Sequence, residues 1–322
     1  MDASLPSALT SGIAQLLEGV SRKDLAARAE TLSKAYRGGG TSRGVAGEED
    51  ALAYLISRLP ATYAAVSAAF AAIAKAMPEF APVSLLDAGA GPGAASWAAA
   101  QTWDSLRTTT MLDSNQSFLK VARALAEASE QTVLSGATFA ASDLTGVAKQ
   151  PRADLVVASY VLAELPEKLA PQISETLWNA SSQMLVLVEP GTPQGFARIL
   201  AARTHLLSLG AHIAAPCTHD AGCPMTGKNW CHFSQRLSRT RDHMIAKSAS
   251  VPFEDERYSY LSVVREKPTR LASVRILTEP EDAKPGITLT LCDESGLHRD
   301  LIARRDKERF ARLRKVRWGD AI

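Results

Sequence analysis

The segment 83–93 contains the sequence feature that most restricts the fold. A short apolar run at 83–86 leads into Asp-Ala-Gly-Ala-Gly-Pro-Gly at 87–93, and a helical pattern begins at residue 94. Glycines directly after a strand let the backbone approach a ligand closely, because no Cβ is in the way. The alternation of strand and helix continues to about residue 209, with further strands expected at 108–112, 138–141, 154–158 and 184–188. This pattern predicts an α/β fold with a parallel sheet covered by helices on both faces.

The spacing of these glycines separates two kinds of nucleotide site. A dinucleotide site commonly has the pattern G-x-G-x-x-G, which cradles a pyrophosphate. Here Asp87, Gly89, Gly91 and Gly93 occupy every second position, with Ala88 after the acid. This arrangement resembles the first motif of class I methyltransferases, in which the acidic strand end faces a positively charged cofactor. The resemblance implies a class I methyltransferase Rossmann-like core that binds S-adenosylmethionine.

Polar residues also follow the next three predicted strands. Asp113 ends the second strand, 26 residues after Asp87, and an acid there can accept hydrogen bonds from both ribose hydroxyls. Asp143 ends the third strand, where methyltransferases hold the adenine amino group, and Tyr160 follows the fourth, beside their methyl-donor pocket. Ligands of open α/β sheets bind outside the carboxyl ends of the strands. The expected cofactor site therefore consists of Asp87, Ala88, Gly89, Gly91, Gly93, Asp113, Ser114, Asp143, Leu144, Ser159 and Tyr160.

No catalytic residue is assigned from the sequence. The fourth strand is not followed by the Asn/Asp-Pro-Pro-aromatic tetrad used to methylate exocyclic amines, or by a Pro-Cys pair that would supply a nucleophile. Glu164 and Glu189 fall near the expected mouth of the site. Either fits a general base or a side chain that caps a loop.

Three regions are expected along the chain. Residues 1–78 form a helical N-terminal cap, residues 79–268 form the cofactor-binding core with a cysteine-rich loop at 210–250, and residues 269–322 form a small β-rich basic lobe. No apolar run approaches the roughly 20 residues of a membrane span. The N-terminus has neither a secretory nor a mitochondrial targeting pattern, which predicts a cytoplasmic protein.

Charge is unevenly distributed along the chain. Residues 201–322 hold 21 Lys and Arg against 15 Asp and Glu, whereas residues 1–200 hold 15 against 19. The basic excess is densest at Arg299, Arg304, Arg305, Lys307, Arg309, Arg312, Arg314, Lys315 and Arg317. A basic end on a neutral body indicates contact with a polyanion, above all nucleic acid. A solvated amphipathic helix would give the same pattern.

All four cysteines lie in the last third of the chain. Cys217, Cys223 and Cys231 fall within fifteen residues of a polar segment, and Cys292 ends a distant predicted strand. Buried structural thiols would be scattered, and a reducing compartment disfavours disulfides, so a metal site is the favoured interpretation. Zinc sites usually have Cys-x2–4-Cys knuckles, whereas four thiolates are the usual ligands of a 4Fe–4S cluster. Zinc stays open as the alternative, with one cysteine replaced by His212, His219 or His232.

Several segments resemble one known family. They are Cys-Thr-His-Asp-x-x-Cys-Pro at 217–224 and Trp-Cys-His-Phe-Ser-Gln-Arg at 230–236, with Arg-Leu-Pro-Ala-Thr-Tyr-Ala at 58–64, Val-Glu-Pro-Gly-Thr-Pro at 188–193, Phe-Glu-Asp-Glu-Arg-Tyr-Ser-Tyr at 253–260 and Arg-Trp-Gly-Asp at 317–320. Together they resemble the methyltransferase-like family of the small ribosomal subunit, the Rsm22 family, whose members include mitochondrial and bacterial proteins. The resemblance extends over nearly the whole chain.

The resemblance implies a cofactor set and a partner. The four cysteines would ligate a 4Fe–4S cluster with a structural role, and the Rossmann core would bind S-adenosylmethionine. The partner would be the small ribosomal subunit and its rRNA, contacted through the basic C-terminal region, with the protein monomeric away from the ribosome.

Three functions compete at this point. The first is an rRNA methyltransferase, and the second is a non-catalytic RNA-binding assembly factor that keeps the methyltransferase fold as a scaffold. The third, a small-molecule methyltransferase with structural zinc, fits the basic C-terminal region less well.

Overall fold

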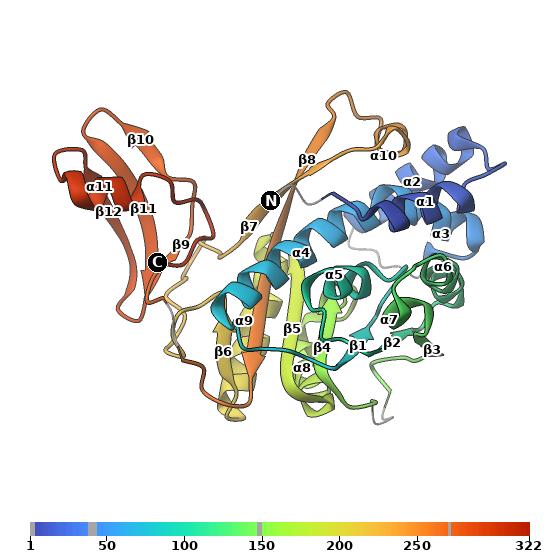
Figure 1. Ribbon diagram of the computed structural model, residues 1–322, viewed down its shortest axis with the longest axis horizontal. Coiled ribbons are helices and arrows are strands. Elements are labelled where there is room, and N and C mark those ends of the chain that lie inside the picture. Colours follow the sequence, from blue (N-terminus) through green and yellow to red (C-terminus); the bar gives the residue numbers. More distant parts are fainter. Residues whose placement is uncertain (1–3, 38–43, 147–149, 270–271) are drawn as a thin grey trace.

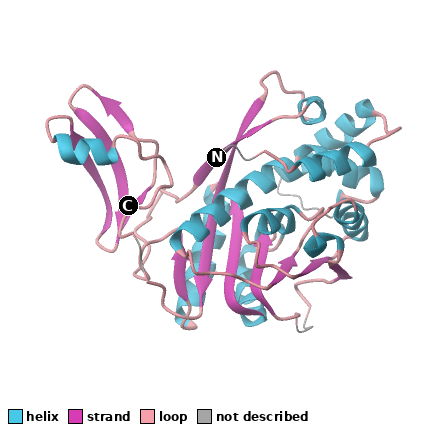
Figure 2. Ribbon diagram, viewed as in Figure 1, coloured by secondary structure: helices cyan, strands magenta, loops and turns pink. Residues whose placement is uncertain are grey.

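The computed structural model describes residues 4–37, 44–146, 150–269 and 272–322 (Figures 1 and 2). A central mixed sheet lies between two layers of helices, and a smaller second sheet stands to one side of this body. The first layer and the N-terminal region contain α1 (Ser7–Leu16), α2 (Arg22–Arg37), α3 (Glu48–Ser57), α4 (Leu59–Ala76), α5 (Ala94–Thr102), α6 (Gln116–Glu127) and α7 (Thr132–Ser135). The second layer contains α8 (Ala170–Ala180) and α9 (Pro193–Ser208).

The order of the central strands identifies the fold. The strands are β1 (Ser84–Ala88), β2 (Thr108–Asp113), β3 (Thr138–Ala141), β4 (Ala153–Ser159), β5 (Ser181–Pro190), β6 (His212–Ala215), β7 (Phe233–Ser238) and β8 (Phe253–Val264). They run in the order β3-β2-β1-β4-β5-β8-β6, with β7 paired to β8. The first five are mutually parallel, and β8 is antiparallel to both β5 and β6. This is the class I methyltransferase arrangement, so the predicted α/β fold is confirmed.

Alternating side chains on the central strands form two separate cores. Leu85, Met111 and Val157 pack under α4, α5 and α6 on one face. Leu86, Leu112 and the neighbouring apolar residues of β4 and β5 pack under α8 and α9 on the other. Burial on both faces explains why these strands are continuous apolar runs.

Helix α4 belongs to this body. By length and composition alone it could cross a membrane, but 61% of its apolar window is buried. It packs on α5 and against β6, β7 and β8, with Phe70 and Ile73 fully buried. The apolar composition of α4 is therefore explained by its place in the core.

Strands β7 and β8 continue as a two-stranded ribbon. Only the second half of β8, from Tyr258, pairs with β5, while the first half pairs with β7. Helix α10 (Arg241–Ala246) connects β7 to β8 and packs on α2 and α3 (Figure 1). The segment expected as a loop at 210–250 thus contains β6, β7 and α10, and the cysteine-bearing loop itself spans only 216–232.

The C-terminal lobe is a second sheet with one helix. Its elements are β9 (Arg275–Ile276), β10 (Glu281–Ala283), β11 (Gly286–Asp293), β12 (Gly296–Ala303) and α11 (Lys307–Leu313). Leu289 and Ile302 form a small core with Leu313 of α11. The basic segment is only partly helical, because Arg299 lies on β12 and α11 covers only Lys307–Leu313.

Candidate functional site

The glycine loop between β1 and α5 has the conformation expected of a ligand-binding turn. Gly89, Gly91 and Gly93 have φ angles of +74°, +53° and +92°. A Cβ on Gly89 would lie 2.4 Å from Cγ2 of Val161, whereas a Cβ on Gly91 would meet no atom within 4 Å. The loop is therefore packed tightly at its first glycine and open at its second.

Asp87 anchors this loop to the helix that follows it. One carboxylate oxygen accepts hydrogen bonds from the backbone nitrogen and hydroxyl of Ser96, at 3.0 and 2.8 Å. The other oxygen is buried, with no hydrogen-bond partner among the residues that the structure describes. Burial raises the pKa of Asp87 to about 7, against the opposing effect of the Ser96 bonds. Ala88, beside it, is fully buried.

Asp113 connects the loop to the second strand. It is almost fully buried and accepts hydrogen bonds from the backbone nitrogens of Gly91 and Asn115, both at 2.7 Å. Burial raises its pKa, and these backbone bonds oppose the rise. Each carboxylate oxygen has a second lone pair, so the group can still accept a further donor.

The remaining predicted residues follow the carboxyl ends of β2, β3 and β4. Asp113 pairs in register with Ala141, two residues before Asp143, so the acids that follow β2 and β3 stand at one edge. Asp143 is exposed and caps its own turn by accepting from Thr145, while Leu144 is buried. Ser114 is exposed, and Ser159 is half-buried. The fold thus brings the predicted cofactor residues to one edge of the sheet.

Tyr160 has an unusual backbone and a fixed hydroxyl. Its φ angle is +61°, a left-handed conformation that is uncommon for a bulky residue. Its hydroxyl donates to Oε1 of Glu256 on β8 at 2.7 Å, and the guanidinium of Arg58 lies 5.9 Å from the ring centroid. The ribbon of β7 and β8 therefore reaches back to the end of β4. Arg58 and Glu256 lie in the family-like segments 58–64 and 253–260, but no role at this site was expected for either residue.

Glu189 acts as a cap. It is fully buried, and its two oxygens accept from the backbone nitrogens of Leu162 and Ala163 at 2.8 and 2.9 Å. Burial raises its pKa to about 8. The sequence allowed Glu189 to be either a general base or a side chain that caps a loop. Its two backbone hydrogen bonds support the second role.

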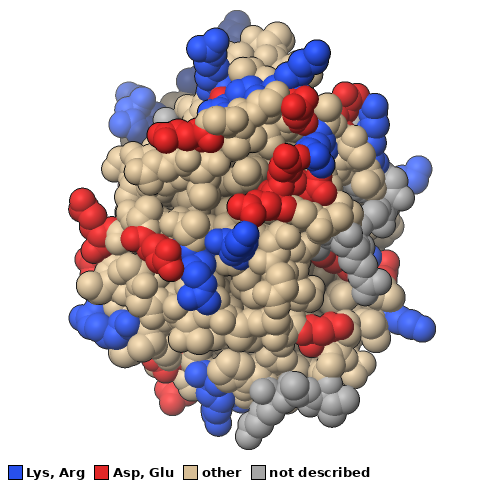
Figure 3. Space-filling view, turned by 90° about the vertical axis from the view of Figure 1, so that its right-hand side faces the viewer, with Lys and Arg blue, Asp and Glu red and all other residues tan. Residues whose placement is uncertain are grey.

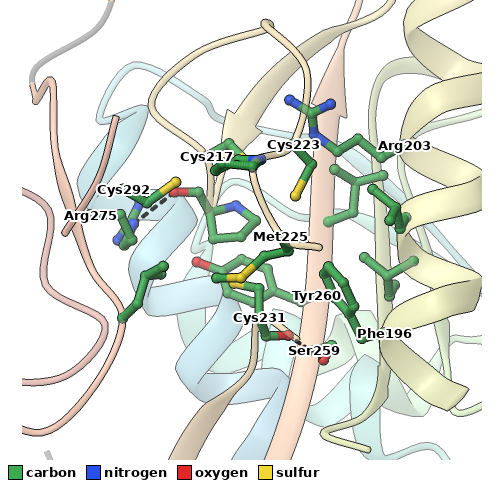
Figure 4. Close-up of a pocket in the computed structure, with 16 residues that line it drawn as sticks. Phe196, Arg203, Cys217, Cys223, Met225, Cys231, Ser259, Tyr260, Arg275 and Cys292 are labelled. Carbon is green, nitrogen blue, oxygen red and sulfur yellow. Dashed lines mark hydrogen bonds between the residues drawn. The ribbon is translucent and has the colours of Figure 1, made fainter. Parts of the chain in front are cut away.

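The four cysteines line one cavity of about 40 Å³ between the body and the C-terminal lobe (Figure 4). Cys217 follows β6, Cys223 and Cys231 lie in the loop to β7, and Cys292 comes from β11. None forms a disulfide. Within the described parts of the chain, no group of three or more His, Cys, Asp or Glu side chains has the spacing of ligands to a metal ion. The four thiols therefore line a common cavity, but they are not close enough together to bind one metal ion in this arrangement.

Hydrogen bonds from both sides hold the cysteine loop. The Ser259 hydroxyl donates to the Cys231 carbonyl at 2.7 Å, and the Thr218 hydroxyl donates to the Ser273 carbonyl at 2.8 Å. Trp318, near the C-terminus, donates to the His232 carbonyl at 3.0 Å. The loop therefore links the core to the lobe.

Burial dominates the chemistry of these thiols. It raises the pKa of Cys292 to about 12, with Cys217 and Cys223 adding to the rise and Arg203 opposing it. Burial also raises the pKa of Cys223 and, more strongly, that of Cys231. Metal binding at such thiols must displace their protons.

The three histidines named as alternative ligands differ in position. His212 contacts Asp220 at 3.0 Å, and His232 stacks on Trp230 with ring centroids 5.1 Å apart. His219 is buried, and its Nε2 lies 4.0 Å from Sγ of Cys292. Of these three histidines, His219 is the one placed next to a cysteine thiol in the described part of the chain.

The basic C-terminal residues fall into two groups. Arg299, Arg304 and Arg309 form ion pairs with Glu281, Asp282 and Asp300. The others are exposed and have no ion pair among the residues that the structure describes: Arg305, Lys307, Arg312, Arg314, Lys315 and Arg317. On the far side of the molecule, the face shown in Figure 3 has basic and acidic side chains interspersed.

Comparison with known proteins gives a family match over most of the chain. The family described as "Mitochondrial small ribosomal subunit Rsm22" matches residues 48–322. The human mitochondrial ribosome assembly protein METTL17 is 30% identical over 289 residues, covering 84% of this chain and 62% of its own length. The Rsm22-cox11 tandem protein 2 of Schizosaccharomyces pombe, also mitochondrial, is 28% identical and covers 73% of this chain and 38% of its own length. The chain thus spans less than two thirds of either relative.

Two solved methyltransferase structures are similar to part of the chain. Magnesium protoporphyrin IX methyltransferase from Synechocystis with bound S-adenosylmethionine has a TM-score of 0.41 and 19% identity, covering 69% of this chain and 85% of its own. An O-methyltransferase family 2 protein from Planctomyces limnophilus has a TM-score of 0.40 and 16% identity. The match covers 80% of this chain and 66% of that protein's chain.

One expectation is corrected by the relatives. The missing targeting pattern predicted a cytoplasmic protein, but the matched family and both relatives are described as mitochondrial. The prediction of a cytoplasmic location is therefore wrong. Its basis was the composition of a few N-terminal residues, which carries less information than a match over most of the chain.

Proposed function

Because the chain belongs to the Rsm22 family, we propose that it is a methyltransferase-like factor that acts on the small ribosomal subunit and its rRNA. The observation that carries this proposal is the family match over 48–322, which includes the Rossmann core, the cysteine loop and the basic lobe. The human relative is named as a ribosome assembly protein, which supports a role in assembly of the subunit.

The proposed cofactor of the core is S-adenosylmethionine. The open backbone at Gly91, the buried acid Asp113 and the acid Asp143 stand at the carboxyl edge of the sheet, where such folds bind ligands. Asp113 would accept from the ribose hydroxyls, and Asp87 would keep the loop in place. Titration calorimetry tests this proposal. Asp113→Ala is expected to lower affinity at least tenfold, whereas Glu175→Ala, on the outside of the fold, is expected to leave affinity unchanged.

The proposed second group is a structural 4Fe–4S cluster held by the four cysteines. Three observations support it: the four thiols, their common cavity, and its position between core and lobe. When bound, such a cluster supplies rigidity, because its binding energy is also folding energy. Metal analysis after purification without oxygen tests this proposal. About four iron atoms and four sulfides per chain are expected, and one zinc would overturn it.

RNA contact is proposed for the C-terminal lobe, 269–322. Six exposed Lys and Arg side chains there have no ion pair among the described residues, so their charge is available for phosphate groups. Changing Lys307, Arg312 and Lys315 to Gln should weaken binding to small subunits. The slope of log affinity against log salt should become shallower by about two to three.

A matched control uses the paired arginines. Changing Arg299, Arg304 and Arg309 to Gln removes the same charge, but each change also frees an acidic partner. The salt dependence is expected to change less than in the first variant. Equal effects would mean that overall charge, and not the unpaired cluster, determines binding. Away from the ribosome, the protein is proposed to be a monomer. Light scattering would measure its mass in solution.

The second candidate is a non-catalytic assembly factor. Two observations favour it: Glu189 is used as a cap, and the hydroxyl of Tyr160 is bonded to Glu256. Neither group is then available as a base in this arrangement. Labelled S-adenosylmethionine and small subunits from cells lacking the protein distinguish the candidates. Label on the rRNA would establish methyl transfer, and no label from cofactor-loaded protein would favour the assembly factor.

A further inference from the structure

Two buried arginines border the cysteine cavity, one from the core and one from the C-terminal lobe. We propose that Arg203 and Arg275 are the counter-charges of the anionic iron–sulfur cluster and set its reduction potential. This inference rests on the proposed cluster and assigns a role to residues of the chain that do not ligate it.

Arg203 comes from α9 and is 4% exposed. One terminal nitrogen donates to the carbonyl of Ala221 at 2.5 Å, and its buried Nε has no hydrogen-bond partner in the described part of the chain. It lines the cavity beside Cys223 (Figure 4). Its charge acts on Cys223 and Cys292, where it opposes the rise in pKa caused by burial.

Arg275 comes from β9, on the other side of the cavity, and is 5% exposed. Its Nε donates to the carbonyl of Pro216 and a terminal nitrogen to the carbonyl of Gly319, each at 2.7 Å. Pro216 directly precedes Cys217, so this side chain also holds the cysteine loop to the lobe. Its charge opposes the rise in the pKa of Cys231.

Neither guanidinium is neutralised by a carboxylate. Within the described residues, both arginines donate only to backbone carbonyls and have no acid within ion-pair distance. Asp293, the acid that acts on Cys292, bonds to Ser295 and lies 3.7 Å from His298. A buried charge without an opposite charge is costly to the fold, because its hydration is lost.

An anionic cluster removes this imbalance. Four thiolates around an oxidised 4Fe–4S core leave roughly two negative charges, which two guanidiniums would balance. A nearby positive charge favours the more negative, reduced form of a cluster, because reduction adds an electron. Loss of either arginine should therefore lower the potential.

The experiment compares charge-removing with charge-keeping variants of the full chain purified without oxygen. Arg203→Gln and Arg275→Gln are expected to shift the ratio of oxidised to reduced cluster at a fixed potential about tenfold, equal to about 59 mV for one electron. Arg203→Lys and Arg275→Lys keep the charge and should stay near the wild-type potential. Redox titration followed by electron paramagnetic resonance measures the shift.

Arg265→Gln is the matched control. Arg265 also donates to backbone carbonyls, those of Trp178 and Ser181, but it follows the end of β8 and does not line the cavity. Its loss should leave the potential unchanged.

Each outcome decides the proposal. Unchanged potentials in the Gln variants would overturn it. If the Gln variants fail to keep iron, retention by the Lys variants would support the charge requirement, whereas loss in both would assign the arginines to holding the loop. A wild-type protein without iron would instead reject the cluster itself, which separates that failure from this one.

Discussion

Replacing Gly89 by alanine tests the packing of the glycine loop. A Cβ at this position would lie 2.4 Å from Cγ2 of Val161, and the backbone φ is +74°. Gly91 is a natural comparison, because its φ is +53° but a Cβ there would meet nothing within 4 Å. The two substitutions therefore share backbone strain and differ in steric overlap.

The expected magnitudes follow from these two terms. Left-handed backbone costs a non-glycine residue roughly 1–2 kcal/mol, so Gly91→Ala should lower the free energy of unfolding by about that amount. Overpacking adds roughly 1–3 kcal/mol, so Gly89→Ala should cost about 2–5 kcal/mol in total. Cofactor affinity should fall more in Gly91→Ala than in Gly89→Ala, because the new methyl of Gly91→Ala would occupy the open side of the loop.

Urea unfolding of both variants and calorimetry with S-adenosylmethionine measure these effects. Adding Val161→Ala to Gly89→Ala should restore the part of stability lost to overlap, and adding it to Gly91→Ala should restore nothing. Equal destabilisation by the two alanines, or no rescue of the first, would refute the reasoning.

Three further results are expected. Burial raises the pKa of Asp87 from 3.8 to about 7, so the folded state binds more protons in this interval and stability should fall as pH rises from about 4 to 7, by up to roughly 4 kcal/mol. Asp87→Asn should flatten this part of a pH series of unfolding curves, and an unchanged slope would contradict the assignment. Tyr160→Phe removes the bond to Glu256 and should cost about 1–3 kcal/mol in thermal unfolding, with no further loss if Glu256→Ala, which leaves no acceptor, is already present. Cys292→Ser should lose iron and melt the C-terminal lobe early, and full iron with an unchanged melting profile would show that this thiol is not a ligand.

Local pattern was sufficient to predict the core of the fold. The apolar runs that became β1, β2, β4 and β5 are short, continuous and separated by helical periodicity. Each of these signals lies within a few residues, and a strand end fixes the place of the residue that follows it. For this reason the sequence alone predicts that Asp87, Asp113 and Asp143 lie at one edge of the sheet.

Pattern was insufficient where pairing depends on distant segments. β8 comes late in the chain but lies between β5 and β6, and its first half leaves the sheet to pair with β7. The short strands β6 and β7 fell within a segment expected to be a loop. A segment of four to six residues has too little periodicity to indicate a strand by itself. Both strands are stabilised by pairing with β8, which comes later in the sequence.

The sequence by itself determined the parallel α/β core, the glycine turn and the acids at its strand ends, since local periodicity and backbone freedom specify these features. Tertiary structure alone decided which charges are neutralised and which are buried. It placed Cys292 in one cavity with Cys217, and it paired Arg299 and Arg304 with acids of β10, on the other side of β11. It also buried Arg203 and Arg275 with no acidic partner among the described residues. An arginine looks the same in a sequence whether it lies in water or beside four thiols, and the difference arises only when segments far apart in the chain exclude solvent together.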